Sequence, residues 1–261
     1  MEIAVIAVAV VLGFLLGSFA NVVIHRVPEG ASVVQPRSAC PACGTTIAAR
    51  DNVPVLSWVL LRGRCRSCGE PISPRYPLVE AASGAVFGVV AWQAGPSALL
   101  PAFLAFAWVL LVLSVIDART RRIPNAITYP SVPVLLVLTV GGSLLEGDVA
   151  GAVRSPLAGV AAFVALLAIA LIAPKGMGMG DVKLAGLMGI VLGALGWGHV
   201  VLGVFGGFLV GGVTAIALLA LRVRKRRDLI PFGPYLAAGA LGALLFGELL
   251  IDAYLRGVGL R

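Results

Sequence analysis

Long runs of apolar residues dominate the chain, and about eight of them approach the length of a membrane-spanning helix. A helix crosses the hydrocarbon core of a bilayer with roughly 17–25 residues. The runs lie at about 3–24, 78–94, 98–116, 126–145, 156–174, 184–198, 200–221 and 233–251. The run at 184–198 is short and rich in glycine, so its two ends are the least sharply defined by the sequence. The pattern predicts an all-α polytopic membrane protein with about eight transmembrane helices.

The composition supports this prediction. Of the 261 residues, 59% are hydrophobic and 12% are charged, and the mean hydropathy is +1.02. A soluble domain is about half apolar and a quarter charged, so we expect the lipid bilayer to surround this chain. The first run carries Glu2 in place of a basic start, and no A-x-A-like cleavage site follows it. We therefore expect residues 1–24 to be a retained first transmembrane helix.

Positive charge gathers on one side of the predicted membrane. Seventeen of the 20 Lys and Arg residues lie in the loops 25–77, 117–125, 174–183 and 222–228. The other three are Arg154, Arg256 and Arg261. Short loops rich in Lys and Arg stay in the cytoplasm. These four loops are therefore predicted to be cytoplasmic and both termini to lie outside. The same loops account for the formal net charge of +8 without a nucleic acid partner.

The loop 25–77 is too long for a connector and holds all four cysteines. They form two C-x-x-C pairs, each followed by a glycine, at a spacing close to that of zinc sites: Cys40, Cys43, Cys65 and Cys68. Four thiolates complete a tetrahedral Zn2+ site and leave no open position, so the site is predicted to be structural. Because the loop has too little apolar material for its own core, we expect zinc to staple it into a small cytoplasmic domain.

Other roles for the cysteines are less favoured. Disulfides are rare in the cytoplasm. A thioredoxin-like redox role would need a βαβ pattern beside one pair, and the sequence has none. Zinc ribbons also bind nucleic acid, but this loop has no interleaved aromatic residues beyond Trp58 and Tyr76. We therefore expect no nucleic acid partner.

A glycine-rich stretch, residues 175–183, lies between two apolar runs. Gly176, Gly178 and Gly180 permit backbone angles that a helix interior disfavours, and Asp181 follows them directly. An ionisable residue near the hydrocarbon is costly unless it faces a cavity or a partner, so it is a functional candidate. Taken alone, the stretch is equally compatible with a flexible loop whose aspartate is simply solvated.

A second aspartate, Asp117, follows the apolar run 98–116 and is predicted on the same side of the membrane as Asp181. Aspartic proteolysis needs such a pair: one carboxylate activates water as a base, and the other, protonated, donates to the scissile carbonyl. Two like charges that approach closely cannot both ionise, which gives this split of roles. Asp117 alone could instead cap its helix or pair with nearby arginines. The two aspartates together favour catalysis.

Three further features each have two interpretations. Glu80, near the start of the run 78–94, is either a first-turn acid favoured by the helix dipole or a site residue. Gly13, Gly17 and Asn21 share one face of the first run, which is typical of helix packing, with a substrate groove as the alternative. His199 is isolated and is expected at the membrane interface rather than in catalysis.

The ordered set of motifs resembles the bacterial type IV prepilin peptidases, aspartic proteases of the Gly-x-Gly-Asp class. The resemblance covers nearly the whole chain and is specific as a set, although each motif alone is weak. It rests on both cysteine pairs, on Asp117 and Asp181, and on the segments 17–22 with Arg26, 51–58, 75–80, 123–125, 178–183 and 231–234.

The resemblance implies a membrane aspartic endopeptidase of the bacterial cytoplasmic (inner) membrane, with Asp117 and Asp181 as the catalytic pair facing the cytoplasm. Its substrates would be precursors of type IV pilins or pseudopilins, cut after a glycine that ends a short basic leader. Family members with the cysteine domain typically also methylate the new N-terminus with S-adenosylmethionine. No nucleotide-binding signature appears in the sequence, so methylation follows from the resemblance, with Glu80 and the cysteine domain as the candidate site.

The sequence thus predicts a first transmembrane helix at 1–24, a zinc domain at 25–77 and a membrane peptidase domain at 78–261, with no particular oligomeric state. Two other classes of function compete. A proton-coupled transporter could use both aspartates as a relay, but transporters place such residues near the midplane within repeated halves. A zinc-bearing membrane scaffold without chemistry would leave the paired aspartates unexplained.

Overall fold

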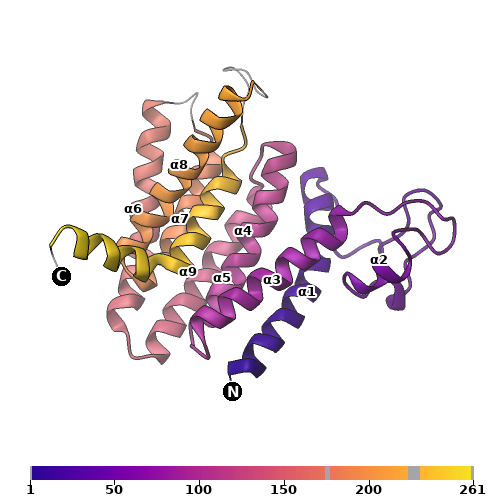
Figure 1. The fold of residues 1–261 in the computed structure, drawn as a ribbon, viewed down its shortest axis with the longest axis horizontal. Helices are drawn as coiled ribbons and strands as arrows, with labels where there is room; N and C mark the ends of the chain where they lie inside the picture. Colours follow the sequence, from indigo (N-terminus) through magenta and orange to yellow (C-terminus); the bar gives the residue numbers. More distant parts are fainter. Residues whose placement is uncertain (1, 174–176, 223–229, 260–261) are drawn as a thin grey trace. The chain divides into compact units, whose positions relative to one another are not determined.

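The chain folds almost entirely into helices. The computed structural model describes residues 2–173, 177–222 and 230–259 (Figure 1). Within these ranges there are long helices of 17–25 residues, and pairing between extended segments is limited to two isolated β-bridges. The predicted all-α class is confirmed. The chain divides into two compact units, Met1–Pro96 and Ser97–Arg261.

Six of the described helices are long and apolar enough to cross a membrane. They are α1 (Glu2–Arg26, extended by the short helix η1 to Glu29), α4 (Leu100–Thr120), α5 (Asn125–Leu145), α6 (Val149–Ile172), α8 (Trp197–Ala220) and α9 (Gly233–Gly257). The protein is therefore a multi-pass membrane protein. The helices α3 (Arg75–Ala94) and α7 (Met179–Leu195) do not meet the same length and hydropathy criterion. The number of about eight spans stays a prediction.

In the first unit, α1 packs closely on α3 through two glycines. A Cβ atom on Gly13 would lie 2.8 Å from Phe87 Cβ, and one on Gly17 would lie 2.8 Å from Glu80 Cα. Side chains at these two positions would push the helices apart. The small residues of the first run therefore serve helix packing, as the pattern of Gly13, Gly17 and Asn21 favoured.

The segment between α1 and α3 contains two copies of one small structure. In the first, Cys40 N–H donates to Thr45 O and Gly44 N–H donates to Cys40 O, at 3.0 and 2.9 Å. The same bonds recur 25 residues later, from Cys65 to Glu70 and from Gly69 to Cys65, at 2.8 and 2.9 Å. Both glycines have a positive φ, +70° and +75°, which a residue with a side chain rarely adopts. We call these copies the two knuckles.

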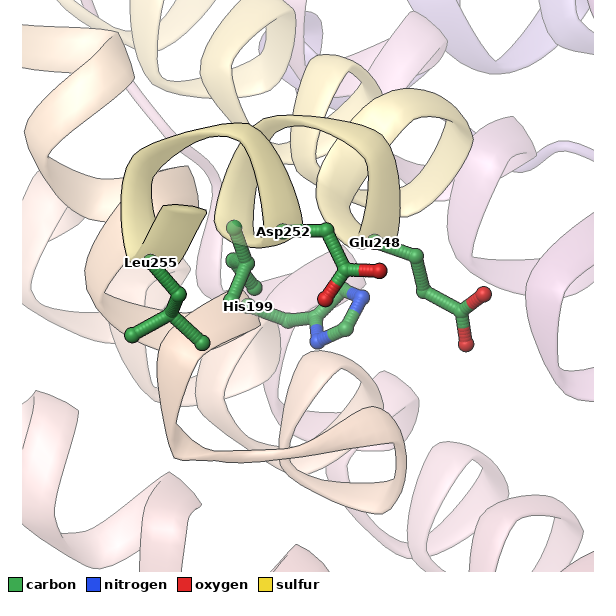
Figure 2. Close-up of a pocket in the computed structure, with 5 residues that line it drawn as sticks. His199, Glu248, Asp252 and Leu255 are labelled. Carbon is green, nitrogen blue, oxygen red and sulfur yellow. The ribbon is translucent and has the colours of Figure 1, made fainter. Parts of the chain in front are cut away.

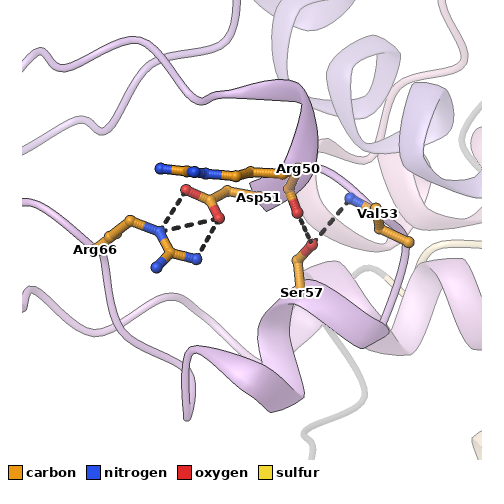
Figure 3. A network of polar contacts seen from close by, with 5 residues as sticks. All are labelled: Arg50, Asp51, Val53, Ser57 and Arg66. Atoms are coloured by element: carbon orange, nitrogen blue, oxygen red, sulfur yellow. Dashed lines mark hydrogen bonds and ion pairs between the residues drawn. The ribbon is translucent and has the colours of Figure 1, made fainter.

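Polar contacts tie the knuckles to the chain between them. This intervening chain forms η2 (Ala49–Asp51) and α2 (Leu56–Leu60). Arg66 of the second knuckle donates two hydrogen bonds to Asp51 from Nε and one from Nη2, at 2.6–3.1 Å (Figure 3). Ser57 Oγ donates to Arg50 O at 3.1 Å and accepts from Val53 N–H at 3.0 Å (Figure 3).

In the second unit, the glycine-rich helix α7 is the core. Every residue from Leu184 to Ala194 is buried, and α7 contacts α4, α5, α6, α8 and α9 (Figure 1). Its bounds differ from the predicted run 184–198, because the helix begins five residues earlier and ends at Leu195. Gly196, with φ +149°, then separates α7 from α8. A helix that is apolar on all sides has no amphipathic pattern from which its ends can be read.

Helix α6 approaches α7 closely and satisfies its last carbonyl groups. A Cβ atom on Gly189 of α7 would clash with the backbone oxygen of Ala158 on α6. Arg154 on α6 donates to Gly193 O and Ala194 O, at 2.6 and 2.7 Å. A guanidinium at this end complements both the free carbonyl groups and the helix dipole. These contacts hold the C-terminal half of α7 against α6.

Candidate active site and metal centre

Asp117 lies in the last full turn of α4, which continues to Thr120 rather than ending at the aspartate. The residue is 5% exposed, and its Oδ2 accepts the N–H of Gly233, the first residue of α9, at 2.9 Å. A Cβ atom on Gly233 would lie only 2.9 Å from Asp117 Oδ2. Gly233 thus permits this approach, and its N–H at the start of α9 meets a carboxylate, which the helix dipole favours there.

Asp181 lies in the first turn of α7, because the helix begins at Met179 within the predicted loop 174–183. It is partly buried, and its Oδ2 accepts the N–H of Gly178 at 3.3 Å. Gly178 is therefore the N-cap of α7, with an aspartate reaching back to its backbone. Lys175 and Gly176 of the predicted glycine-rich stretch lie outside the described residues, as do the basic residues 224–227 of the loop 222–228.

The structure brings the two aspartates to one end of the second unit. The end of α4 and the starts of α7 and α9 supply the two carboxyl groups and the N–H bound to Asp117, and α4 contacts both other helices. Asp117 in the last full turn of α4 and Asp181 in the first turn of α7 therefore stand at the same end of two contacting helices. Two interacting carboxyl groups, each with one backbone N–H donor, can share a single proton across a water molecule.

The connector between α4 and α5 also packs against the start of α7. Arg121 caps α4 in the left-handed conformation, with φ +54°, and its N–H donates to Asp117 O at 2.8 Å. Gly180 faces Ile123, since a Cβ atom there would lie 2.8 Å from Ile123 Cβ. The sequence analysis expected Gly180 to permit backbone angles that a helix disfavours, but Gly180 lies within α7 and has no positive φ. It assigned no separate role to Gly233. Only their short separations from Ile123 and Asp117 show why glycine stands there.

The four cysteines come together as a metal-binding group. Their Sγ atoms all lie within 4.8 Å of one another, and Cys40 Sγ and Cys68 Sγ are 3.8 Å apart. A tetrahedral site with Zn–S bonds of about 2.3 Å has S···S edges of about 3.8 Å. None of the four cysteines forms a disulfide. The residues present therefore fit a metal ion held by four thiolates.

The surroundings of the sulfur atoms favour thiolates at two positions. Hydrogen bonds with Thr45 lower the pKa of the Cys43 thiol to about 6, and the Thr45 side chain contributes more than the Thr45 backbone N–H. The backbone N–H groups of Cys68 and Ser67 lower the pKa of the Cys65 thiol. Backbone N–H groups within or just after each C-x-x-C pair thus point at sulfur. Thiolate is the form that binds a metal.

Glu80 lies in the second turn of α3, because that helix begins at Arg75, so the first-turn interpretation was wrong. It is 9% exposed. Its carboxylate accepts the N–H of Val55 at 2.7 Å. Val55 has φ +59° and ψ −50°, an outlying conformation for a β-branched residue. Glu80 therefore holds a strained residue of the segment 51–58 against the α1–α3 pair.

A separate cavity of about 330 Å³ lies between the first turn of α8 and the last turns of α9 (Figure 2). His199, which is 7% exposed, reaches it beside Glu248, Asp252 and Leu255. The ring packs directly on α9, where a Cβ atom on Gly247 would clash with His199 Cδ2. His199 is thus buried next to acidic side chains rather than isolated, and it lies far from the two aspartates.

Helices that can cross a membrane, two aspartates at one end of the second unit and a four-cysteine group that could hold a metal ion are the features of a polytopic membrane enzyme. The profile of the bacterial peptidase A24 N-terminal domain matches residues 11–94, and that of the type IV leader peptidase family matches residues 104–216. The chain belongs to this family. The two matches fall within the two compact units.

Three relatives carry the name prepilin leader peptidase/N-methyltransferase. The protein from Stutzerimonas stutzeri is 36% identical, over 97% of this chain and 95% of its own length. The one from Pseudomonas aeruginosa is 34% identical, over 99% and 96%. The one from Aeromonas hydrophila is 38% identical, over 92% and 90%. No solved structure matches the chain.

Proposed function

We propose that this protein cleaves the leader of type IV prepilins or pseudopilins in the bacterial inner membrane and methylates the new N-terminal residue. Family membership and the names of full-length relatives support both activities. The observation that supports the peptidase half is the placement of Asp117 and Asp181 at the adjoining ends of the contacting helices α4 and α7. A transporter does not require such a pair at the helix ends, and a scaffold does not require it at all.

In this mechanism Asp117 is the base and Asp181 is the acid. The negative charge of the pair is better placed on Asp117, whose Oδ2 accepts the Gly233 N–H at 2.9 Å, than on Asp181, whose N–H donor is 3.3 Å away. Asp117 takes a proton from water as the oxygen attacks the scissile carbonyl carbon. Asp181 gives its proton to the carbonyl oxygen. When the C–N bond breaks, the proton on Asp117 passes to the leaving nitrogen, and Asp181 takes back a hydroxyl proton as the carbonyl group re-forms.

The test replaces each acid with its isosteric amide. Asp117→Asn and Asp181→Asn are each expected to lower the rate of leader cleavage about 10²- to 10⁴-fold, the range that a general acid or base contributes. Methylation of a pilin peptide that has already been cleaved serves as the control for a folded protein and is expected to persist. Cleavage at the wild-type rate by either variant would remove the aspartates from the mechanism.

The proposed orientation has both termini outside and the aspartates at the cytoplasmic edge. The positive-inside rule supports it, because Arg119, Arg121 and Arg122 follow Asp117 within one turn or two. A reporter enzyme that is active only outside the cytoplasm, fused after residue 261, is then expected to be active. An inactive reporter on a correctly inserted chain would reverse the orientation.

For the four-cysteine group we propose structural Zn2+, held by all four thiolates with no position open for substrate. The 3.8 Å separation of Cys40 Sγ and Cys68 Sγ supports this choice. The metal would hold the two knuckles together, and no step of proteolysis passes through it. A metal-free preparation of folded wild-type protein would argue against zinc.

For methyl transfer from S-adenosylmethionine we propose a site that includes Glu80 and the cysteine domain. Glu80 is buried, and its carboxylate already accepts a hydrogen bond from the Val55 N–H. Its contribution is therefore to hold the segment 51–58 in place. Glu80→Gln is expected to reduce methylation of a cleaved pilin peptide and to leave leader cleavage near the wild-type rate. Equal loss of both activities would show a general folding defect instead.

A further inference from the structure

The start of α7 is joined to the start of α5 by one short polar contact. Lys183 Nζ donates to Asn125 Oδ1 at 2.6 Å. The same ammonium group lies 5.0 Å from the centre of the Tyr129 ring, within the range of a cation–π interaction. Asn125 and Tyr129 are one turn apart on α5, so the lysine is held between two residues of that helix.

Both ends of this contact are close in sequence to an aspartate. Lys183 stands two residues after Asp181 on α7. Asn125 follows the connector that begins when Arg121 ends α4 through its bond to Asp117 O. The connector also packs on α7, with Ile123 against Gly180. The backbone segments that carry the two carboxyl groups are thus fastened to each other at Gly180 and at Lys183.

The Lys183 ammonium group makes these contacts with α5 rather than with Asp181. The Asp181 carboxylate accepts the Gly178 N–H. Residues two apart on a helix point to different faces, which agrees with this. The positive charge is directed to Asn125 and Tyr129 on α5 instead.

We infer that Lys183 and Asn125 are a positioning pair that sets the separation of Asp117 and Asp181. The inference rests on the proposed function, because the separation matters only if both carboxyl groups share the proton that drives cleavage. The Lys183–Asn125 bond holds the first turn of α7 against the connector after α4. Without it, the first turn of α7 can shift along the connector, and Asp181 moves with it.

The experiment compares Lys183→Met and Asn125→Ala, which each remove one side of the contact. Each is expected to lower kcat for leader cleavage about tenfold to hundredfold, the effect of a misplacement of about 1 Å, with little change in KM. The double variant is expected to lose no more than either single variant, because both remove the same contact. Asn125→Asp retains an acceptor for the ammonium group, so this variant is expected to cleave at close to the wild-type rate, unlike Asn125→Ala.

The pH profile separates positioning from mere loss of folded protein. Two coupled carboxyl groups give a bell-shaped dependence of kcat on pH, and the distance between its limbs includes their mutual repulsion. If Asp181 moves away from Asp117, the limbs move closer together. A smaller folded fraction lowers the whole curve and leaves its shape unchanged. Tyr129→Phe keeps the ring under the lysine and is the matched control, expected to match the wild type in rate and profile.

Several results would overturn the inference. These are a wild-type rate for Lys183→Met, losses that multiply in the double variant, a higher KM at unchanged kcat, or a lower kcat with an unaltered pH profile. Asp117→Asn is measured in parallel. If it cleaves at the wild-type rate, the proposed function itself fails. If it is inactive while Lys183→Met is fully active, only the positioning role fails.

Discussion

Between residues 30 and 74 the buried residues are Ser57 and Gly63, whereas every residue of α7 from Leu184 to Ala194 is buried. The knuckles and the chain between them have no apolar core, so a few polar contacts and four thiols at one point must order them. The second unit is ordered by close packing of glycine-rich helices. Loss of one metal ligand is therefore expected to unfold the whole segment between residues 30 and 74. A single unfavourable contact in the second unit is expected to lower its free energy of unfolding only in part.

The largest expected effect comes from removing two of the four cysteines that are proposed to hold zinc. Cys40→Ser combined with Cys43→Ser should abolish the content of about one zinc per chain in the purified protein, measured by elemental analysis. Structural zinc contributes about 10–16 kcal/mol of folding free energy in small metal-bound domains. Limited proteolysis should then cut between residues 30 and 74, while the helices of the second unit stay protected. Wild-type resistance of this segment in the double variant would mean that polar contacts alone suffice.

An intermediate effect is expected where the packing of α6 and α7 is tightest. Gly189→Ala places a methyl group against the backbone oxygen of Ala158, and the helices must separate to admit it. Overpacking of this kind destabilises by about 1–3 kcal/mol, which a thermal unfolding curve in detergent detects. The control is Gly141→Ala on α5, where a Cβ atom meets nothing within 4 Å. That variant should be as stable as the wild type, and equal loss in both would refute the packing argument.

The smallest expected effect belongs to the ion pair of Asp51 and Arg66. Hydrogen bonds from Arg66 lower the pKa of the Asp51 carboxyl, so the folded pKa lies below the unfolded value of about 3.9. The contribution of the pair is complete above the unfolded pKa and is lost as the pH falls through the folded pKa. Asp51→Asn should therefore make the loop slightly more sensitive to proteolysis at pH 7. This difference should vanish in strong acid, where a persistent difference would point to another cause.

Much of the site could be predicted from particular residues. The C-x-x-C pairs predict a metal group because spacing along the chain sets which sulfur atoms can meet. Asp117 and Asp181 were identified as candidates because an ionised side chain beside hydrocarbon is costly unless it faces a cavity or a partner. The role of Glu80 could not be read in the same way, because its partner Val55 is 25 residues away and is defined by a strained backbone. The sequence showed only that Arg154 lies outside the four basic loops. In the structure its guanidinium donates to the last carbonyl groups of α7.

The sequence by itself determined the helical class, the apolar runs and the presence of a four-cysteine group, because hydrophobic length and local spacing depend only on neighbouring residues. Tertiary structure decided the bounds of α7, the N–H of Gly233 on Asp117 and the Lys183–Asn125 contact. Each of these depends on helices that are distant in sequence and meet only when their small residues allow close approach. The separation of two carboxyl groups is a property of that packing.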